Sequence, residues 1–386
     1  MILRIAADVF ESPSEGETLS LLELIFHDQS RAHGPILRLW PEHEELNDRG
    51  AFRRWLGHLG DRGPEVLALF NLGAVRESML SVVQPSYAVG VGRRSRMLDV
   101  RVESRPHSDW PALRLTVADA LELVKEPIHL RLEDEYNDMA FVCWLAPPTT
   151  RDDLRVLLRD AGRVHTHGGG TGTIGRWLGR LEDEPVLQPD EQRRLWRTWV
   201  LFDKDAGAQD ARDPSKTAKS LMLTCERVVA KHHIPFTWIC LQRREIESYV
   251  PDEGLRSTGS TGSAKAAKLI RQWRAHPDRQ AYAWAYDMKN GLLGDLVPEI
   301  TSVRRTALRS KNAGPPGGGE LKEPFRGLSK DERRILERGF GGNLLNGPLH
   351  ENPPPRWLLE IGNEYDRGPV HQVSRQALLQ SIFDRI

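Results

Sequence analysis

The sequence has few cysteines, no long apolar run and no excess of charge of either sign, and each absence argues against a class of protein. Its 386 residues include three cysteines, Cys143, Cys225 and Cys240, and none of them forms a CxxC pair. Three cysteines cannot hold a chain of this length together through disulfides, so we expect a reducing, cytoplasmic environment. No stretch approaches the roughly 18 apolar residues that a membrane helix needs. Residues 1–10 lack the pattern of a secretory signal.

The charged side chains balance, with 54 Lys and Arg against 54 Asp and Glu. A net charge of zero disfavours a protein that coats nucleic acid through a strongly basic surface. No lysine precedes Lys125, which we attribute to codon bias rather than to selection for phosphate binding. The sequence also has no GxxxxGK[ST] loop. If an ATPase is involved, it must therefore be a separate protein.

What is present is a chain long enough, at 386 residues, for two or three domains, and its 39% hydrophobic residues can form their cores. Residues 1–124 have an α+β composition, with strands expected near 81–91 and 98–103, and carry no motif that assigns a role. Residues 256–386 are expected to be mainly helical with Gly- and Pro-rich loops, such as 309–320. In that region Ser329 and Glu332 have capping-box spacing, which predicts a helix start.

Residues 125–255 alternate between apolar runs and amphipathic segments, which is typical of an α/β unit. The expected strands are 128–132, 163–167, 199–202 and 234–241, and the expected helices are 136–145, 173–181 and 215–231. This repetition predicts a parallel sheet with flanking helices. Ligands of such sheets bind beyond the carboxyl ends of the strands, so polar residues there are the first site candidates.

Three of the four expected strand ends carry carboxylates. Glu133 and Asp138 follow the first strand, Asp203 and Asp205 follow the third, and Glu247 follows the fourth. The second strand ends in three glycines, 168–170. Carboxylates that converge repel one another unless a cation neutralises them, and oxygen ligands favour Mg²⁺ or Mn²⁺. These five acids are the candidate metal ligands, and Glu133, Asp203, Asp205 and Glu247 are the candidate catalytic residues.

The order of these features resembles a TOPRIM domain, the metal-binding fold shared by topoisomerases, primases and several nucleases. The family pattern is a Glu after the first strand, a Gly-rich turn after the second and Asp-x-Asp after the third; Glu133, Gly168-Gly169 and Asp203/Asp205 match it in that order. The segment RREIESY at 243–249 is similar to the Arg-rich, Glu-x-Tyr ending of OLD-like (overcoming lysogenisation defect) nucleases and related anti-phage defence effectors. The resemblance covers residues 128–250 only.

The first motif departs from the commonest family pattern, Glu-Gly-x-x-Asp. Asp134 replaces the glycine, and Asp138 lies five rather than four positions after Glu133. The metal-facing acid could therefore be Glu133, which ends the apolar strand, or Glu135. We expect Glu133.

The resemblance implies a Mg²⁺-dependent endonuclease that hydrolyses phosphodiesters, with DNA favoured over RNA as substrate, and an anti-phage defence effector that works with a separate ATPase subunit. A second interpretation is a catalytically inactive TOPRIM-like module that binds nucleic acid or an ATPase partner. A third is an NAD-dependent oxidoreductase, because 170–175 reads GxGxxG with Asp190 about 20 residues on. Zinc binding by His165, His167, His232 and His233 is disfavoured, since no paired cysteines accompany them.

Overall fold

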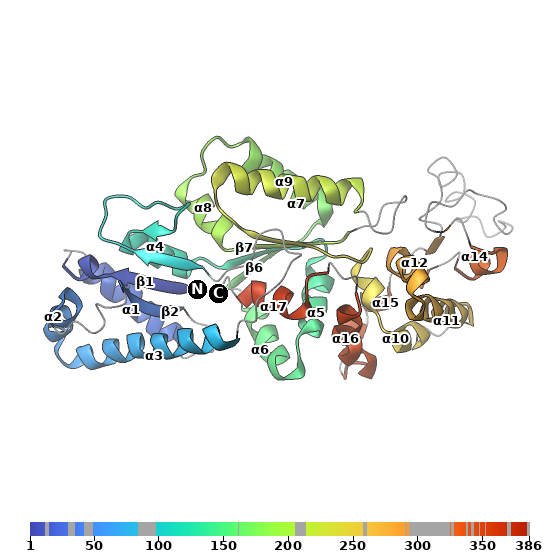
Figure 1. The fold of residues 1–386 in the computed structure, drawn as a ribbon, viewed down its shortest axis with the longest axis horizontal. Helices are drawn as coiled ribbons and strands as arrows, with labels where there is room; N and C mark the ends of the chain where they lie inside the picture. Colours follow the sequence, from blue (N-terminus) through green and yellow to red (C-terminus); the bar gives the residue numbers. More distant parts are fainter. Residues whose placement is uncertain are drawn as a thin grey trace.

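The structure is a computed structural model of the chain. It describes residues 1–11, 15–29, 35–41, 49–83, 98–160, 162–204, 214–257, 261–289, 291–292, 325, 328–336, 339–340, 343–346, 348–351, 353–368 and 372–383. Figure 1 shows that the N-terminal sheet, a second sheet and a group of C-terminal helices follow one another along the long axis. No described helix has the length and apolar character needed to cross a membrane.

The first sheet is parallel and has the order β2-β1-β3-β4. Its strands are β1 (Ile2–Ala6), β2 (Ile36–Trp40), β3 (Asp99–Val102) and β4 (Arg114–Leu115). The associated helices are α1 (Glu15–Gln29), α2 (Ala51–His58), α3 (Gly63–Val83) and α4 (Val117–Lys125). Parallel pairing with crossover helices makes this region α/β, so the expected α+β class was wrong.

One of the two strands expected in the N-terminal region is present. The prediction at 98–103 is confirmed by β3. At 81–91 the expectation was wrong for residues 81–83, which end helix α3, while 84–91 lie outside the described residues. The apolar, β-branched composition of this stretch did not separate a strand from the end of a buried helix.

The second sheet is also parallel, with the order β6-β5-β7-β8, as the alternating pattern predicted. Its strands are β5 (Ile128–Arg131), β6 (Val164–His167), β7 (Thr198–Phe202) and β8 (Thr237–Cys240). The helices between them are α5 (Glu135–Leu145), α6 (Pro148–Arg159), α7 (Gly170–Asp183), α8 (Pro189–Trp196) and α9 (Lys216–His232). The α/β architecture expected for the central region is therefore present.

Side-chain caps fix where several helices begin. Asp134 accepts hydrogen bonds from the backbone amides of Tyr136 and Asn137, each at 3.1 Å, at the start of α5. Ser215 Oγ accepts from the Ala218 amide at 3.0 Å at the start of α9. Such caps satisfy amides that have no partner within the helix.

The capping box predicted at Ser329 is confirmed. Glu332 N donates to Ser329 Oγ at 3.2 Å, and the Glu332 carboxylate accepts from Ser329 N at 2.9 Å. The helix that follows is α14 (Lys330–Leu336).

The two faces of the second sheet bury separate hydrophobic cores. Val200 and Phe202 face a core that continues through α7 and α9 into the first sheet. Trp199 and Leu201 face the other core, which continues into the C-terminal helices. Alternation along a strand sends neighbouring side chains to opposite faces, so one strand can join both cores.

The C-terminal part of the described chain contains helices and no strand. The α-helices are α10 (Asp252–Ser257), α11 (Thr261–Ala275), α12 (Gln280–Ala285), α14, α15 (Asn343–Asn346), α16 (Ile361–Asp366) and α17 (Arg375–Phe383). The boundary expected after residue 255 falls inside α10. The Gly/Pro-rich segment 309–320 lies outside the described residues.

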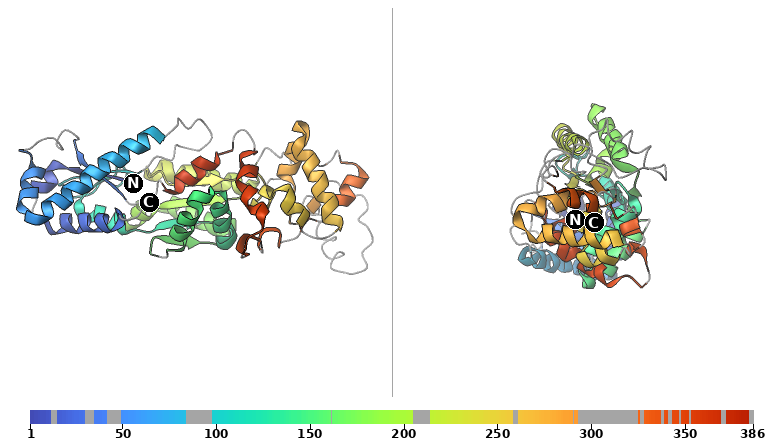
Figure 2. Two further views of the ribbon diagram at one scale, coloured as in Figure 1. Left: turned by 90° about the horizontal axis from the view of Figure 1, so that it is seen from below. Right: turned by 90° about the vertical axis from the view of Figure 1, so that its right-hand side faces the viewer.

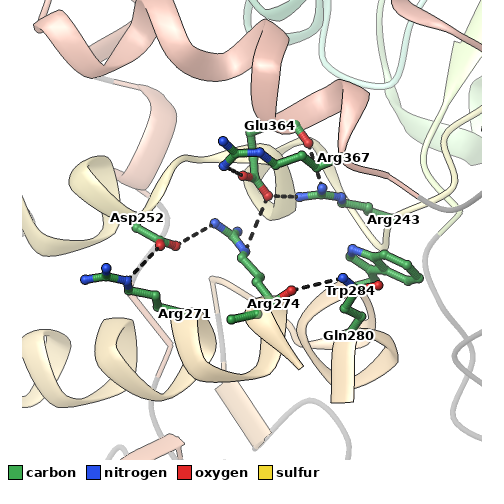
Figure 3. Close-up of a pocket in the computed structure, with 9 residues that line it drawn as sticks. Arg243, Asp252, Arg271, Arg274, Gln280, Trp284, Glu364 and Arg367 are labelled. Carbon is green, nitrogen blue, oxygen red and sulfur yellow. Dashed lines mark hydrogen bonds and ion pairs between the residues drawn. The ribbon is translucent and has the colours of Figure 1, made fainter. Parts of the chain in front are cut away.

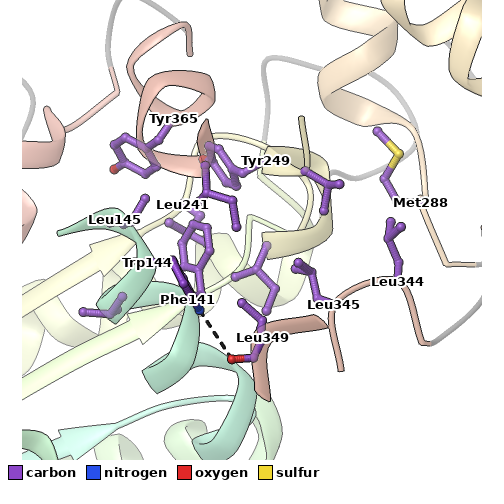
Figure 4. Packing of buried hydrophobic residues seen from close by; sticks show 14 of the residues in the cluster. Phe141, Trp144, Leu145, Leu241, Tyr249, Met288, Leu344, Leu345, Leu349 and Tyr365 are labelled. Carbon is purple, nitrogen blue, oxygen red and sulfur yellow. Dashed lines mark hydrogen bonds between the residues drawn. The ribbon is translucent and has the colours of Figure 1, made fainter. Parts of the chain in front are cut away.

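These helices cover the core that contains Trp199 and Leu201, on one face of the second sheet. Figure 4 shows Phe141 and Trp144 of α5 beside Tyr249 and Tyr365, whose rings stack with centroids 5.0 Å apart. Trp199 is fully buried, and its Nε1 donates to Ser381 Oγ of α17 at 2.8 Å. The central sheet is thus covered by residues that come far later in the chain.

Candidate functional site

The carboxyl edge of the second sheet contains a topological switch point between β5 and β7. Strand β5 pairs with β6 on one side and with β7 on the other. The connection after β5 therefore runs to one side of it, and the connection after β6 returns the chain to the other side. Loops diverge at such a point and leave room for a ligand. Glu133 follows β5 and Asp203 follows β7, which places both at this edge.

Glu133 and Asp203 are in direct contact. The Glu133 Oε1 atom accepts a hydrogen bond from the Asp203 backbone amide at 2.7 Å. The Glu133 carbonyl accepts from Gly170 N at 2.9 Å and from Gly169 N at 3.3 Å. Gly169 and Gly170 have φ of 116° and 77°, a region that favours glycine. The glycine turn after β6 therefore holds the backbone of Glu133.

Glu135, the alternative to Glu133, faces a different neighbour. Its side chain is exposed and accepts a hydrogen bond from the Thr166 hydroxyl on β6. A Cβ at Gly168 would lie 3.0 Å from Glu135 Cβ, so glycine permits this close approach. Of the two acids, Glu133 is the one in contact with Asp203.

Asp138 is buried beneath the Glu133 loop. Its Oδ2 atom accepts hydrogen bonds from the amides of Glu133 and Asp134, each at 3.0 Å. Burial, together with the negative charges of Glu133 and Asp134, raises the pKa of Asp138 to about 7. Asp138 therefore fixes the loop that carries Glu133 and adds negative potential to the edge.

Asp203, which follows β7, has a pKa that is shifted by the other acids of this edge. It is only partly exposed, so most of its surface is withdrawn from solvent. Burial raises its pKa well above the usual range, and four carboxylates raise it further: Glu133, Asp138, Glu247 and Glu245. Burial and these four negative charges therefore oppose the ionisation of Asp203.

Glu247 lies in the 3₁₀ segment η4 (Ile246–Tyr249), which follows β8, and is 1% exposed. Its Oε1 atom is 3.0 Å from Lys289 Nζ. Its Oε2 atom is buried and accepts no hydrogen bond from the described residues. Burial raises the pKa of Glu247, and the ammonium of Lys289 opposes that rise.

Three further charged residues at this edge, Glu245, Asp287 and Lys289, were not among the candidate site residues predicted from the sequence. Lys289 Nζ lies 3.6 Å from Glu245 Oε2 as well as contacting Glu247. Glu245 Oε1 accepts from the Met288 amide at 2.8 Å, and burial with the charge of Glu247 raises the Glu245 pKa to about 8. Asp287 pairs with Arg244 at 3.1 Å. Residues 287–289 carry no motif, so only the fold reveals them.

The two arginines at 243 and 244 make structural contacts. Arg243 pairs with Glu364 at 2.8 Å, and Arg244 pairs with Asp287 at 3.1 Å. The Tyr249 hydroxyl accepts from the Arg243 amide at 3.2 Å and donates to Gln372 at 3.1 Å. The Arg-rich, Glu-x-Tyr segment therefore anchors the C-terminal helices to the sheet.

The candidate ligand set is not assembled as a closed metal site. In the part of the chain that the structure describes, no three His, Cys, Asp or Glu side chains are placed together as a bound metal ion requires. Asp205, the second acid of the Asp-x-Asp pair, lies outside the described residues. The acids that are described offer oxygen donors, a set that suits a hard divalent cation.

The glycine motif at 170–175 opens α7 after β6, which is an edge strand. A Cβ at Gly172 or Gly175 would make only ordinary contacts, so neither glycine is required by a close approach. Asp190 lies on α8 and pairs with Arg193 at 3.1 Å. These placements do not favour nicotinamide binding, which needs an acid at the end of the next strand.

The rings of three described histidines, His129, His167 and His232, lie within hydrogen-bond distance of polar partners. His129 Nδ1 lies 3.2 Å from His167 Nε2, and His129 Nε2 lies 2.9 Å from Glu126. The His232 ring lies 2.7 Å from the Leu181 carbonyl. No described group of histidines meets the requirements of a metal site.

Comparisons with known proteins add no assignment to this geometry. No protein-family model matches the sequence, and neither a curated protein nor a solved structure matches the chain.

Proposed function

We propose that the carboxylate edge binds Mg²⁺ or Mn²⁺ and that the chain is a metal-dependent nuclease with a TOPRIM-like central region. The observation that carries the proposal is the contact of Glu133 with the Asp203 amide at the carboxyl ends of adjacent strands. Burial and the charges of Glu133, Asp138 and Glu247 raise the pKa of Asp203 there. Ionised carboxylates this close repel one another, and a divalent cation is the partner that relieves the repulsion most directly.

A second observation supports a cation at this edge. Glu247 Oε2 is buried without a hydrogen-bond donor among the described residues. A buried ionised oxygen without a donor is costly, and a metal ion would supply the missing positive partner. Lys289 bonds the other oxygen of the same carboxylate.

The proposed roles follow from these contacts. Glu133, Asp203 and Glu247 would hold the ion, with Asp205 contributing from outside the described residues. Asp138 would position Glu133 through the two amides that it caps. Bound there, the cation would supply positive charge to the oxygens of a phosphodiester during hydrolysis. Lys289 would hold the other carboxylate oxygen, Glu247 Oε1, 3.0 Å from its Nζ.

The test compares cleavage and metal binding in matched variants. Supercoiled plasmid and RNA are incubated with the protein and Mg²⁺, Mn²⁺ or EDTA. Glu133→Gln and Asp203→Asn should abolish cleavage. Glu135→Gln, which removes a charge two residues from Glu133 but contacts Thr166, should retain it. Cleavage that persists in EDTA, or in both of the first two variants, contradicts the proposal.

Metal binding can be measured without activity. Mg²⁺ should raise the thermal midpoint of the wild type and of Glu135→Gln, because it binds the folded state. The midpoint of Glu133→Gln and of Asp203→Asn should rise less. A midpoint unaffected by Mg²⁺ and Mn²⁺ in the wild type rules out the metal site.

A second candidate is a catalytically inactive TOPRIM-like module that binds nucleic acid or an ATPase subunit. The observation that favours it is the Glu133–Asp203 amide contact, which occupies one oxygen of the first candidate ligand. Nucleic-acid binding without cleavage in any metal would favour this candidate. A role in anti-phage defence with a separate ATPase is proposed from the sequence resemblance alone.

A further inference from the structure

A pocket of about 310 Å³ lies among the C-terminal helices and the segment that leaves β8. Figure 3 shows side chains from α10, α11, α12 and α16 converging on it. It does not include any of the carboxylates that surround Asp203. The pocket is therefore a separate site.

Positive charge dominates this pocket. Its lining includes two carboxylates, Asp252 and Glu364, and four arginines: Arg243, Arg271, Arg274 and Arg367. The four guanidinium groups exceed the two carboxylates by two formal charges. Because the whole chain has a net charge of zero, this excess is a local feature. Such a lining favours an anion.

Two of the arginines form the inner wall: Arg243 is buried, and the Arg274 side chain is 11% exposed. Arg243 Nη1 bonds Glu364 at 2.8 Å and the Ser248 carbonyl at 2.7 Å. Arg274 bonds Asp252 at 3.1 Å and the same Ser248 carbonyl at 3.0 Å. Burial and the positive charge of Arg243 lower the pKa of Arg274, and the carboxylates of Glu364 and Asp252 oppose this shift. This wall would be stabilised by an added negative charge.

The other two arginines, Arg271 and Arg367, lie at the rim and have guanidinium N–H groups that remain available to a ligand. The side chains of Arg271 and Arg367 are 63% and 75% exposed. Arg271 reaches Asp252 through Nε at 3.7 Å, and Arg367 reaches Glu364 through Nη1 at 3.5 Å. Their remaining guanidinium nitrogens bond no described residue. Guanidinium groups with unused paired donors match the geometry of phosphate oxygens.

An aromatic side chain completes the pocket. Trp284 of α12 is partly exposed and lines the pocket beside Arg243 and Gln280 (Figure 3). Aromatic rings beside a cationic groove stack on nucleic-acid bases. The volume lies at the small end of the range for ligand pockets, about 300–1,000 Å³, which suits one nucleotide rather than a duplex.

We infer that this pocket binds a single nucleotide unit, with its phosphate on Arg271 and Arg367 and its base against Trp284. The ligand is a free nucleoside phosphate or one nucleotide of a single strand, since both present the same chemistry. The inference does not depend on cleavage at the carboxylate edge. Both arginines of the inner wall bond the Ser248 carbonyl, next to Glu247, so the pocket and the edge share a segment of backbone.

The test measures binding of fluorescent mant-AMP to the full chain by anisotropy, with AMP, inorganic phosphate and a short single-stranded oligodeoxynucleotide as competitors. The double variant R271A/R367A should weaken binding about tenfold or more, because charge-assisted hydrogen bonds are lost. The matched control K268A/R334A also removes two exposed positive charges from this region but none from the pocket. Its affinity should equal that of the wild type.

The competitors identify the source of the ligand. Displacement by both AMP and the oligonucleotide supports binding of a nucleotide within a strand, and displacement by AMP alone supports a free nucleotide. Trp284→Ala should weaken AMP binding and leave phosphate binding unchanged. The inference is overturned if mant-AMP does not bind, if inorganic phosphate competes as well as AMP, or if K268A/R334A loses as much affinity as R271A/R367A.

Discussion

The carboxylate of Glu133 accepts a hydrogen bond from the backbone amide of Asp203 at 2.7 Å, although the two residues are 70 positions apart. The contact exists because β5 and β7 are adjacent parallel strands that end at the same edge. It brings the first and third acidic segments of the sequence together. The same edge also collects Glu247 and Lys289 from later segments.

We expect the unfolding free energy of the wild type to fall as the pH rises toward about 7, and that of Asp138→Asn to fall less. Burial, with the charges of Glu133 and Asp134, raises the pKa of Asp138 from 3.8 to about 7. The folded state therefore holds this proton more tightly than the unfolded state. Its contribution is fully present below pH of about 4 and is lost as the pH rises through about 7. Urea unfolding across this range should give the variant a smaller decline in unfolding free energy than the wild type.

The control for this prediction is Asp152→Asn, since the Asp152 side chain is 88% exposed. This variant should follow the wild-type pH dependence. Equal slopes for Asp138→Asn and the wild type would show that Asp138 ionises normally in the folded protein.

Glu126→Gln should lower the free energy of unfolding by about 2–3 kcal/mol at neutral pH, because it removes a buried charged acceptor. Glu126 lies 2.7 Å from Arg193 and 2.9 Å from His129. Burial alone would raise the pKa of Glu126, but these hydrogen bonds outweigh it and lower the pKa to about 2. The contribution is therefore fully present above pH of about 4.5 and is lost as the pH falls from there through about 2.

Glu122→Gln is the matched control, because Glu122 lies one turn earlier in a half-exposed pair with Lys125. Exposed pairs contribute little, so its effect on chemical denaturation should stay below about 0.5 kcal/mol. Similar losses in the two variants would argue against a special role for the Glu126 network.

Glu364→Gln should lower the free energy of unfolding by about 3 kcal/mol, because it leaves Arg243 without its charged partner. Arg243 is 1% exposed, and the Glu364 side chain is 6% exposed. The pair joins α16 to the segment after β8 across 121 positions. Urea denaturation measures the loss, and Glu360→Gln, an exposed acid one turn earlier, should leave stability nearly unchanged. Equal stability of the two variants would contradict a structural role for the pair.

Two glycine-to-alanine substitutions should have opposite effects. A Cβ at Gly73 in α3 would collide with the backbone carbonyl of Leu37 in β2, so Gly73→Ala should destabilise the protein by about 2–3 kcal/mol. Gly179 in α7 has open space around its Cβ position, so Gly179→Ala should stabilise it by about 0.5–1 kcal/mol. Thermal unfolding should separate the two variants, and a destabilised Gly179→Ala would contradict the helix argument.

Residues 128–250 were the most predictable part of the fold. Strands β7 and β8 are short, mostly apolar runs, and the amphipathic stripe of Ala218, Leu221, Cys225 and Val228 identifies α9. The first sheet was less predictable, because β1 and β2 lie where the sequence offers no motif and α3 continues through an apolar, β-branched stretch. Local periodicity cannot separate a buried strand from a buried helix in such a stretch.

The candidate site also has a part that the sequence predicts and a part that depends on the fold. The acids after the strands could be identified from the sequence because a parallel sheet places strand ends at one edge. Glu133 rather than Glu135 contacts Asp203, and this choice depends on the glycine turn that holds the Glu133 carbonyl.

The sequence by itself determined the α/β character of the central region, the caps of its helices and the order of its acidic strand ends, because these depend on neighbours within a few residues. Only the tertiary structure decided which acid contacts Asp203, that Lys289 pairs with Glu247, and that Arg243 pairs with Glu364. Those contacts join segments tens to more than a hundred positions apart, and their geometry depends on how the strands pair and the helices pack.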